Sequence, residues 1–433
     1  MPRTVSSLSR RKFLAATSAA GLGAAALSAC SDSGSGSTDS SGRTVVEWWN
    51  IQTTEPTKTL WPQRAKDFEA ANPKVHIKLV TLENDAYKSK MTALTSSGKL
   101  PDIYHTWGGG VLEQQIDAGL VEDLTASTKS WSDTLIPASR APYEVDGKTY
   151  AVPIDIGAVG FWYNKALFKK ASITAPPATW ADFLSAVKQL KAAGITPLAL
   201  AGKEKWPGMY YWAYLSMRTA GVDGMQKAIE SKDFTGDPFV AAGGHLKELV
   251  ALEPFQKGFL GAAYSTPTGE AAAMGNGKAA MELMGQWAPV TQADAGKGLG
   301  DDLGFFPFPS VAGGQGALTD VFGGGGGYAV RKGAPKAAAD FLKWFMTAES
   351  DRILVTKGSM MPVVKDAVSA LTDPNLKAVS DTLGKATGFQ LYLDQALPPA
   401  VGQEVNDSVA ALIAGSKSPE QVTRSITQVF KSQ

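Results

Sequence analysis

Cysteine and histidine are scarce in this chain, which has one cysteine and three histidines in 433 residues. Cys30 has no second cysteine with which to form a disulfide, so the hydrophobic core alone must hold the fold together. His76, His105 and His245 lie far apart in the sequence, and their spacing matches neither a metal site nor a Cys–His nucleophile. The sequence therefore predicts no metal centre.

The chain also lacks an excess of charge of one sign. It has 42 basic and 41 acidic residues, and the only charged residues among residues 1–29 are Arg3, Arg10, Arg11 and Lys12. Without those four, 38 basic residues stand against 41 acidic ones, a net charge of −3. Nucleic-acid binders carry a basic surplus or stripe, so we expect no nucleic-acid partner.

Motifs for phosphate binding and nucleophilic catalysis are missing as well. No Lys-Ser or Lys-Thr follows the glycine run at 323–327, and Gly277 lacks the upstream glycines of a phosphate loop. Neither Ser265 nor Ser359 lies in a Gly-x-Ser-x-Gly elbow. We expect no catalytic residue and no cofactor. The glycine run indicates either turn geometry or a close approach of backbone to a ligand, and on the second interpretation Gly325 is a candidate binding residue.

Residues 1–29 are typical of an export signal. The segment Ser9–Leu14, with Arg10 and Arg11, matches the twin-arginine pattern, and an apolar run rich in Ala, Gly and Ser follows it to Ala29. Leu27–Cys30 resembles a lipobox, in which Cys30 is lipidated and becomes the mature N-terminus. The alternative is an unmodified thiol after an ordinary signal peptide. If Cys30 is lipidated, residues 30–43 comprise the lipidated cysteine and a flexible Ser/Gly tether.

Alternating strands and helices follow the tether. Residues 44–49 and 75–79 are predicted as strands, 57–71 as a helix, and 100–104 as a third strand after a helix with Tyr87, Met91 and Leu94 on one face. This order favours parallel pairing with right-handed crossovers. A second α/β unit begins where Thr179-Trp-Ala-Asp182 fits a capping box, before a helix that ends at Gly194 and a strand at 196–200.

The stretch from Gly147 to Lys169 connects these two units. Pro153 lacks a backbone donor, which makes one continuous central strand unlikely in this stretch. We interpret it as a strand that leaves one sheet, crosses a gap and enters another. The stretch resembles the lobe-crossing signature of the family 1 extracellular solute-binding proteins, the sugar-capturing subunits of bacterial ABC importers. The matching residues are Gly147, Tyr150, Ala151, Val152, Pro153, Tyr163, Asn164, Lys165, Leu167 and Phe168.

This resemblance, together with Phe322 and the glycine run, covers residues 44–433. It implies an α/β, two-lobed periplasmic-binding-protein-like fold of the class II type, with a multi-strand hinge and a ligand cleft between the lobes. Lobe 1 would comprise residues 44–153 plus 320–357, and lobe 2 residues 154–319 plus 358–433. The expected partners are a saccharide ligand and ABC permease subunits in the membrane. The expected form is a monomer exported by the twin-arginine pathway and lipid-anchored at Cys30 to the outer face of the cell membrane.

A sugar offers hydroxyls that donate and accept hydrogen bonds and C–H faces that stack on aromatic rings. The chain places aromatic, acidic and amide residues at predicted strand ends and in loops, where ligands of α/β folds bind. Packing is the alternative for each Trp, and turn or hinge chemistry for Asn50 and Asp155. Glu83 and Glu204 are weaker candidates. The predicted ligand-binding residues are Trp49, Asn50, Asp85, Trp107, Asp155, Trp206, Trp287, Gly325 and Gln395.

The local sequence of these motifs, including Trp48-Trp49-Asn50, resembles that of actinobacterial binders of xylobiose and related xylo-oligosaccharides. One alternative is an exported glycoside hydrolase, for which Asp155 and Glu204 would be the carboxylate pair to test. Another keeps the fold and changes the ligand to a different sugar, a polyol or a metal–anion complex. An iron complex would need convergent tyrosines, and the spacing of Tyr210, Tyr211 and Tyr214 fits an aromatic helix face better.

Overall fold

A computed structural model describes residues 37–433. Its largest sheet has five strands in the order β2-β1-β3-β13-β6. Strand β1 pairs in parallel with β2 and β3, as the strand–helix–strand pattern predicts, and β13 pairs antiparallel with β3 and β6. The strands are β1 (Thr44–Asn50), β2 (Val75–Thr81), β3 (Ile103–Thr106), β6 (Ala151–Pro153) and β13 (Gly327–Val330).

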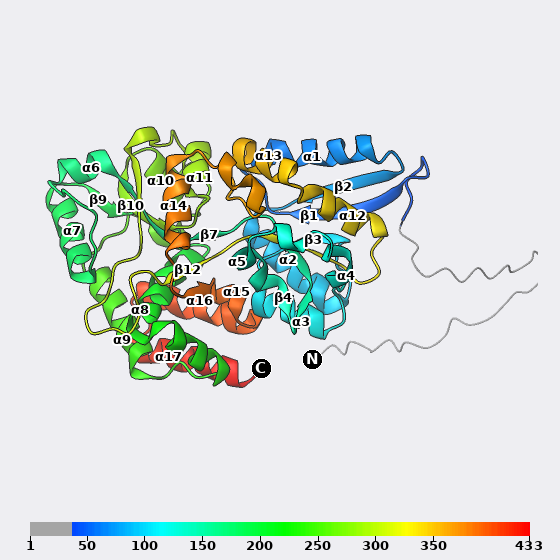
Figure 1. The fold of residues 1–433 in the computed structure, drawn as a ribbon. Helices are drawn as coiled ribbons and strands as arrows, with labels where there is room; N and C mark the ends of the chain where they lie inside the picture. Colours follow the sequence, from blue (N-terminus) through cyan, green and yellow to red (C-terminus); the bar gives the residue numbers. More distant parts are fainter. Residues whose placement is uncertain (1–36) are drawn as a thin grey trace, which may run out of the picture. The chain divides into compact units, whose positions relative to one another are not determined.

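Seven helices accompany this sheet in the sequence. Two of them come from late in the chain, and they pack beside the first helix, at the top of Figure 1. The third strand begins at Ile103, three residues later than predicted, since Pro101 has no amide for pairing. The helices are α1 (Thr57–Ala71), α2 (Asn84–Ser97), α3 (Gly109–Asp117), α4 (Thr125–Thr128), α5 (Pro137–Arg140), α12 (Lys336–Phe345) and α13 (Ala348–Gly358).

The stretch from Gly147 to Lys169 crosses between sheets as the sequence predicts. Its three short strands each belong to a different sheet: β6 to the five-stranded one, β7 (Gly157–Ala158) to a three-stranded one and β8 (Gly160–Asn164) to a four-stranded one. Pro153 ends an edge strand, where its missing N–H does not interrupt a ladder. The three-stranded sheet, in the order β14-β12-β7, also contains β12 (Val321–Gly324) and β14 (Phe389–Leu391).

The four-stranded sheet has the order β11-β8-β10-β9. Strand β10 pairs antiparallel with β8 and in parallel with β9, and β11 pairs antiparallel with β8. This is the second α/β unit that the sequence predicts. The remaining strands of this sheet are β9 (Thr196–Leu198), β10 (Ala279–Met284) and β11 (Leu303–Phe306), and a separate hairpin contains β4 (Glu144–Val145) and β5 (Lys148–Thr149).

The other helices follow the crossing stretch in the sequence. In Figure 1 the C-terminal pair, α16 and α17, lies with α8 and α9, and these four helices contact one another. The residue boundaries of the two lobes stay a prediction. The helices are α6 (Lys165–Lys170), α7 (Trp180–Ala192), α8 (Trp206–Glu230), α9 (Asp237–Val250), α10 (Glu270–Gly275), α11 (Ala288–Ala295), α14 (Pro374–Gly384), α15 (Leu393–Ala396), α16 (Pro399–Ile413) and α17 (Pro419–Lys431).

Five short 3₁₀ turns occur among the described residues. They are η1 (Ser132–Thr134), η2 (Ala141–Tyr143), η3 (Phe259–Gly261), η4 (Gly300–Asp302) and η5 (Lys365–Ala370). The predicted cap of α7 is present, since the Thr179 hydroxyl accepts a hydrogen bond from the Asp182 amide at 3.2 Å. The same hydroxyl donates to Asp182 Oδ2 at 2.7 Å, so the second bond of this cap runs between the side chains.

An aromatic cluster forms the core on one face of the five-stranded sheet. Trp48 packs against Tyr328 and Phe341, with ring centroids 5.4 and 4.9 Å apart. Trp61 Nε1 donates to the Tyr328 hydroxyl at 2.7 Å, which satisfies both buried groups. Because β1 and β13 each supply a ring to this cluster, residues nearly 300 positions apart are fixed to one another.

A kink in α8 holds the loop between β11 and β12. Gly221 has a φ of 73° inside the helix, and the carbonyls of Arg218 and Thr219 accept hydrogen bonds from the loop amides of Gly316 and Gln315. The buried Arg218 guanidinium donates back to loop carbonyls, and no carboxylate contacts it as an ion pair among the described residues. The acceptors are the backbone oxygens of Phe308, Pro309, Ala317, Leu318 and Asp320.

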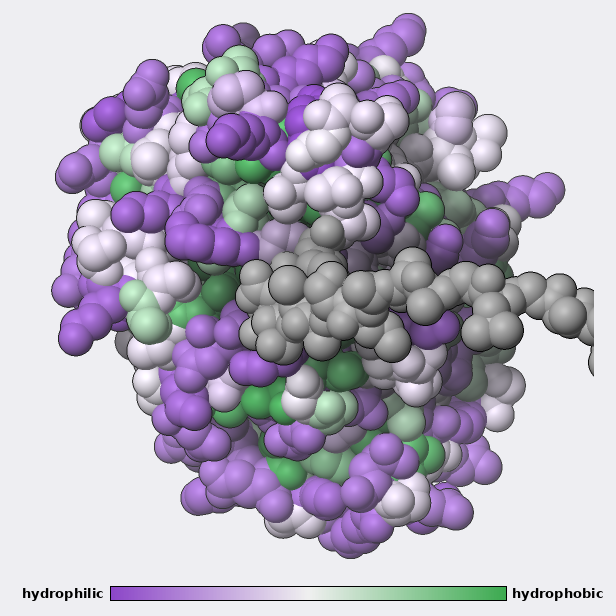
Figure 2. All heavy atoms as spheres, turned by 90° about the vertical axis from the view of Figure 1, so that its right-hand side faces the viewer, coloured by the Kyte–Doolittle hydropathy of each residue, from purple (hydrophilic) through white to green (hydrophobic). Residues whose placement is uncertain are grey.

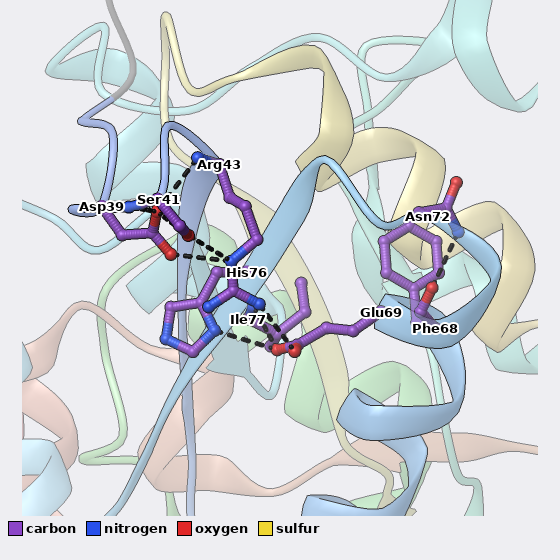
Figure 3. Close-up of polar contacts among 8 residues, drawn as sticks. All are labelled: Asp39, Ser41, Arg43, Phe68, Glu69, Asn72, His76 and Ile77. Carbon is purple, nitrogen blue, oxygen red and sulfur yellow. Dashed lines mark hydrogen bonds and ion pairs between the residues drawn. The ribbon is translucent and has the colours of Figure 1, made fainter.

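The start of the described chain is attached to α1 and β2 through a polar network, drawn in Figure 3. Asp39 Oδ2 lies 2.8 Å from Arg43 Nε, and Arg43 Nη1 lies 3.4 Å from Glu69 Oε2 on α1. Glu69 Oε1 in turn accepts the Ile77 amide of β2 at 2.8 Å. Hydrogen bonds, first that of the Ser41 hydroxyl, hold the pKa of Asp39 below its usual range. These contacts fix where the described chain begins on the five-stranded sheet.

Hydrophilic residues cover most of the face shown in Figure 2, with smaller hydrophobic areas between them. Large hydrophobic side chains that are exposed within residues 37–433 are Leu260, Leu318 and Val368. None of the helices in this part of the chain has the length and apolar content needed to span a membrane. The predicted twin-arginine motif and Cys30 lie outside the described residues.

Candidate functional site

A cavity of about 210 Å³ lies at the carboxyl ends of β1 and β3 and beside the crossing segments. We call it the cleft. On the side of the five-stranded sheet it is lined by the residues after β1, the start of α2 and the end of β3. On the other side the lining comes from the start of α8, the loop before α10 and the loop after β10. Residues 154–155, 325–326 and 358–360 also line it, together with Tyr392, Asp394 and Gln395.

Five aromatic side chains gather on the side of α8. Trp206, the first residue of this helix, lies 5.4 Å from Tyr210 and 6.4 Å from Trp287 between ring centroids. Tyr264 and Tyr392 extend the group, at 5.7 Å from Trp206 and 6.2 Å from Trp287. Tyr210 and Tyr392 are stacked at an interplanar angle of 20°, but the other pairs meet at 56° to 69°, so the group forms an aromatic wall rather than one stack. Such a wall suits the C–H faces of a sugar.

Trp107 faces the cleft from the end of β3. Its ring is half-buried and lies 4.5 Å from the His105 ring, nearly perpendicular to it. Lys88 Nζ lies 5.0 Å from the centroid of the Trp107 ring and 3.0 Å from Asp394 Oδ2. The charge of the lysine is therefore already balanced by a carboxylate. The cleft has no free cation for an anionic ligand among the residues that line it.

Asp155 lies between β6 and β7, where the chain passes from one sheet to another. Its Oδ1 accepts the amides of Ile156 and Met361 at 2.9 and 3.1 Å, and its Oδ2 accepts Gln286 Nε2 at 2.6 Å. Burial raises the pKa of Asp155 to about 7 in spite of these three donors. Gly325 packs directly on its backbone, since a Cβ there would come within 1.9 Å of the Asp155 carbonyl oxygen. Asp155 thus joins the stretch after β6, the segment after α13 and the loop after β10.

Glu204 lies just before α8, next to the aromatic wall. Its carboxylate accepts the Tyr264 amide, with oxygens at 3.1 and 2.9 Å, and this bond positions the aromatic loop. Burial raises the pKa of Glu204 to about 7. Both carboxylates of the predicted hydrolase pair, Asp155 and Glu204, therefore hold backbone amides in place. Within the described residues no group of three or more potential metal ligands occurs.

Several polar atoms of the cleft have no hydrogen-bond partner among the described residues. They include the donors Trp206 Nε1 and Tyr392 Oη, the acceptor Gln286 Oε1, and both ring nitrogens of His105. Burial lowers the pKa of His105 to about 3, so its imidazole is neutral and offers one donor and one acceptor. Buried polar groups require partners. A ligand with hydroxyls, which donate and accept, can satisfy this mixture.

Six of the nine predicted ligand-binding residues line the cleft. They are Trp107, Asp155, Trp206, Trp287, Gly325 and Gln395. The weaker candidates Glu83 and Glu204 also line it. Whether any of them contacts a ligand stays a prediction.

Trp49, Asn50 and Asp85 are not among the residues that line the cleft, and their predicted role in ligand binding stays a prediction. Trp49 lies on the sheet face opposite Trp48, is 8% exposed and has Lys90 Nζ 5.0 Å from its ring centroid. This follows from the two-residue period of the strand. Asn50 is buried, and its Oδ1 accepts the Gln52 amide at 2.9 Å, which is the turn chemistry considered as its alternative. Asp85 belongs to the first turn of α2, whose N-cap is Glu83.

The sequence analysis did not identify some lining residues. The sequence analysis interprets Tyr210 as part of an aromatic helix face and does not consider Tyr264. The rings of both residues contact Trp206. Nothing in the sequence marks Lys88 or His105 as a ligand-binding residue. A lysine in a helix is an ordinary surface residue, and an isolated histidine in a strand is an ordinary core residue. The run of aromatics from 206 to 214 was the one available sign that Tyr210 lies near Trp206.

A buried carboxylate pair lies behind the aromatic wall. Glu270 starts α10 and accepts the Ala201 amide at 2.5 Å, and Glu282 in β10 accepts Gln292 Nε2 at 2.7 Å. Both side chains are buried, and Glu282 Oε2 has no partner among the described groups. Burial raises the pKa of Glu282 to about 8 and the pKa of Glu270 well above its usual range. The folded protein therefore favours the protonated forms.

This pair predicts a stability that falls as the pH rises. An unfolded glutamate titrates near 4.5, so the native state keeps protons that the unfolded state releases. The stabilising contribution of the Glu282 proton is complete below pH 4.5 and is lost as the pH rises through about 8. We expect Glu282→Gln, which mimics the neutral acid, to have a higher melting temperature than the wild type at pH 8 and an equal one at pH 5. A melting-temperature difference independent of pH would contradict this assignment.

Comparison of this chain with known proteins identifies extracellular binding proteins as its relatives. The family model described as bacterial extracellular solute-binding protein matches residues 52–352. An uncharacterized ABC transporter extracellular-binding protein of Pyrococcus horikoshii is 28% identical over 89% of this chain and 87% of its own length. The multiple sugar-binding protein of Streptococcus mutans is 29% identical over 76% of this chain and 77% of its own length.

A solved structure from work on xylan utilization by the thermophilic bacterium Caldanaerobius polysaccharolyticus is similar to this chain throughout. The two sequences are 28% identical, the alignment covers 89% of this chain and 99% of the other, and the TM-score is 0.81. The same architecture recurs in maltose-bound MalE3 of T. maritima at 17% identity and a TM-score of 0.71. The predicted α/β, two-lobed periplasmic-binding-protein-like fold is thereby confirmed.

Proposed function

The chain belongs to the bacterial extracellular solute-binding proteins, and from this premise we propose that it captures xylobiose or a related xylo-oligosaccharide and delivers it to a membrane permease. That the protein is an extracellular sugar-binding protein of an ABC importer follows from its family and its relatives. The choice of xylo-oligosaccharides rests on the local sequence motifs and on the relative associated with xylan utilization.

The observation that carries the proposal is the pairing of the aromatic wall with Trp107 in one cleft. Sugar rings between them would cover both aromatic surfaces, while hydroxyls would reach Gln286, Gln395 and the neutral His105. The lining has a paired lysine and carboxylates with raised pKa values, which suits an uncharged ligand. A neutral saccharide meets each of these conditions.

Capture would proceed by lobe closure around the hinge strands. A ligand shifts an open–closed equilibrium only through its higher affinity for the closed form. A sugar that contacts both the aromatic wall and Trp107 has this differential affinity, because an open form separates the two surfaces. We expect one ligand per monomer and no hydrolysis.

Titration of the fragment from residue 31 onward with xylobiose, xylotriose, cellobiose and maltose tests the proposal. Tryptophan fluorescence and calorimetry should report saturable binding of the xylose series, since Trp residues line the cleft. Failure of every sugar to bind would reject sugar capture, and preference for maltose would reject only the xylose assignment. Release of monosaccharide in the same mixtures would favour the glycoside hydrolase alternative with Asp155 and Glu204.

We also propose that the protein is exported by the twin-arginine pathway and lipid-anchored through Cys30 to the outer face of the membrane. The support is the sequence alone: Arg10 and Arg11 in the export motif, and the single cysteine at the end of the apolar run. Cys30→Ser in the full-length protein should move it from the membrane fraction to the medium. Retention in the membrane fraction would argue against lipidation at this residue.

A further inference from the structure

A second cavity of about 130 Å³ lies between α2, α3 and α16, beside the cleft. It shares Lys88, His105, Trp107, Asp394 and Gln395 with the cleft, so the two cavities adjoin along these residues. Trp107 is therefore a wall common to both. None of the interactions assigned to the cleft explains why the protein has a polar cavity on this side of Trp107.

The lining of the second cavity is neutral and rich in hydrogen-bonding groups. Its charged members are Lys88 and Asp394, which pair with each other at 3.0 Å. Tyr87, Met91 and Val111 supply apolar surface. The threonine and amide side chains that line this cavity and not the cleft are Thr92, Thr95, Thr106, Gln114, Gln115, Gln403 and Asn406. Hydroxyls and amides around apolar surface suit an uncharged polyhydroxy ligand.

Two nearly buried side chains in this lining have polar atoms without hydrogen-bond partners among the described residues. His105 is 4% exposed, and neither of its ring nitrogens has a hydrogen-bond partner among the described residues. Asn406 is 8% exposed, and the same holds for its Oδ1. Buried polar atoms are nearly always hydrogen-bonded. A ligand hydroxyl at this position would supply the missing bonds.

We infer that the second cavity is a further sugar subsite, which holds a terminal ring of an oligosaccharide whose other rings lie in the cleft. This inference rests on the proposed function and deepens it. The ring passes Trp107 at the boundary formed by the Lys88–Asp394 pair. It makes contacts with α2 and α3 on one side and with α16 on the other. A trisaccharide thus gains contacts that a disaccharide does not make.

Chain length is the measurable consequence. Calorimetry of the wild-type protein with xylobiose, xylotriose, cellobiose and cellotriose should show one ligand per protein and a trisaccharide Kd about tenfold lower than that of the matching disaccharide. Thr92 is exposed on α2 at the rim of the second cavity and does not line the cleft. In Thr92→Trp the new ring fills the rim, so the trisaccharide Kd should rise about tenfold to that of the disaccharide.

Ala93→Trp is the matched control. Ala93 is exposed on the same helix and lines neither cavity, so both Kd values should stay as in the wild type. Gln403→Trp, at an exposed position of α16 on the opposite rim, should reproduce the effect of Thr92→Trp. Retained binding of the disaccharide shows that a variant is folded.

Two results would overturn the subsite. One is a wild-type protein that binds di- and trisaccharides with equal affinity. The other is a Thr92→Trp and Gln403→Trp pair that both keep the gain for the trisaccharide. Two ligands per protein would likewise replace the extended site with two separate sites. If no disaccharide binds to the wild type, the proposed function itself fails, and this outcome is distinct from a disaccharide that binds without any gain for the trisaccharide.

Discussion

Trp287→Ala should weaken sugar binding by about 2 to 4 kcal/mol, which raises Kd about 30- to 1,000-fold. Trp287 lies at the centre of the aromatic wall, within 6.4 Å of Trp206 and 6.2 Å of Tyr392 between ring centroids. Its ring folds back over Gly285, where a Cβ would come within 2.2 Å of it. The ring is half-buried, so the change removes a stacking surface for the ligand while the β10 core stays intact. Calorimetry with xylobiose measures the effect.

A matched control is available in Trp131→Ala. Trp131 is also partly buried, but its Nε1 donates to the Ser127 carbonyl at 3.0 Å and its ring does not line the cleft. Its loss should leave the Kd for sugar unchanged. Trp287→Phe should keep part of the affinity, because a smaller ring still stacks. A wild-type Kd in Trp287→Ala would mean that this residue only packs against its neighbours.

Arg218→Met should lower the free energy of unfolding by about 3 to 5 kcal/mol. The guanidinium is fully buried and donates to five carbonyl oxygens of residues 308–320, at distances from 2.7 to 3.2 Å. A methionine fills much of the volume and removes this donor from all five oxygens, of which only the Ala317 oxygen keeps another donor, the Asp320 amide at 3.1 Å. Each unsatisfied buried acceptor costs about 1 to 3 kcal/mol unless the loop opens to water. Thermal or denaturant unfolding measures the loss.

Arg352→Met is the matched control. It removes an exposed arginine and so separates the effect of burial on stability from the effect of losing an arginine. Arg352 is exposed and donates to one carbonyl, that of Asp366, at 2.8 Å. Its replacement should change the free energy of unfolding by less than about 0.5 kcal/mol. Arg218→Lys should be nearly as destabilising as Arg218→Met, since an ammonium has three donors and cannot reproduce the planar arrangement. Equal stability of the Arg218→Met and Arg352→Met variants would refute this role.

Periodicity and turn residues were sufficient to predict much of the fold. The helix at 57–71 and the strand that begins at Thr44 are predicted almost to the residue, because their patterns are long and their ends are marked. The crossing from β6 to β8 was predicted because Pro153 breaks a strand between two apolar runs. Strand β13 was the harder case, since its place between β3 and β6 depends on contacts that no local pattern specifies.

The candidate site could be predicted only in part. Residues after strand ends, such as Trp107 and Trp287, line one cleft in the structure. Trp49 does not line the cleft, because a strand turns alternate residues to opposite faces and the sequence does not say which face meets the cleft. Lys88 and Asp394 are 306 positions apart, so neither could be assigned before their ion pair was known.

The position of β13 also determines the order in which the protein can be made. This strand lies between β3 and β6, so the five-stranded sheet cannot be completed until Val330 has left the ribosome. Until then β3 and β6 each present an unpaired edge, and such edges invite association with other chains. Pairing over so long a stretch of chain also slows folding. While residues 154–330 are being made, these two strands therefore lack the partner that later joins them.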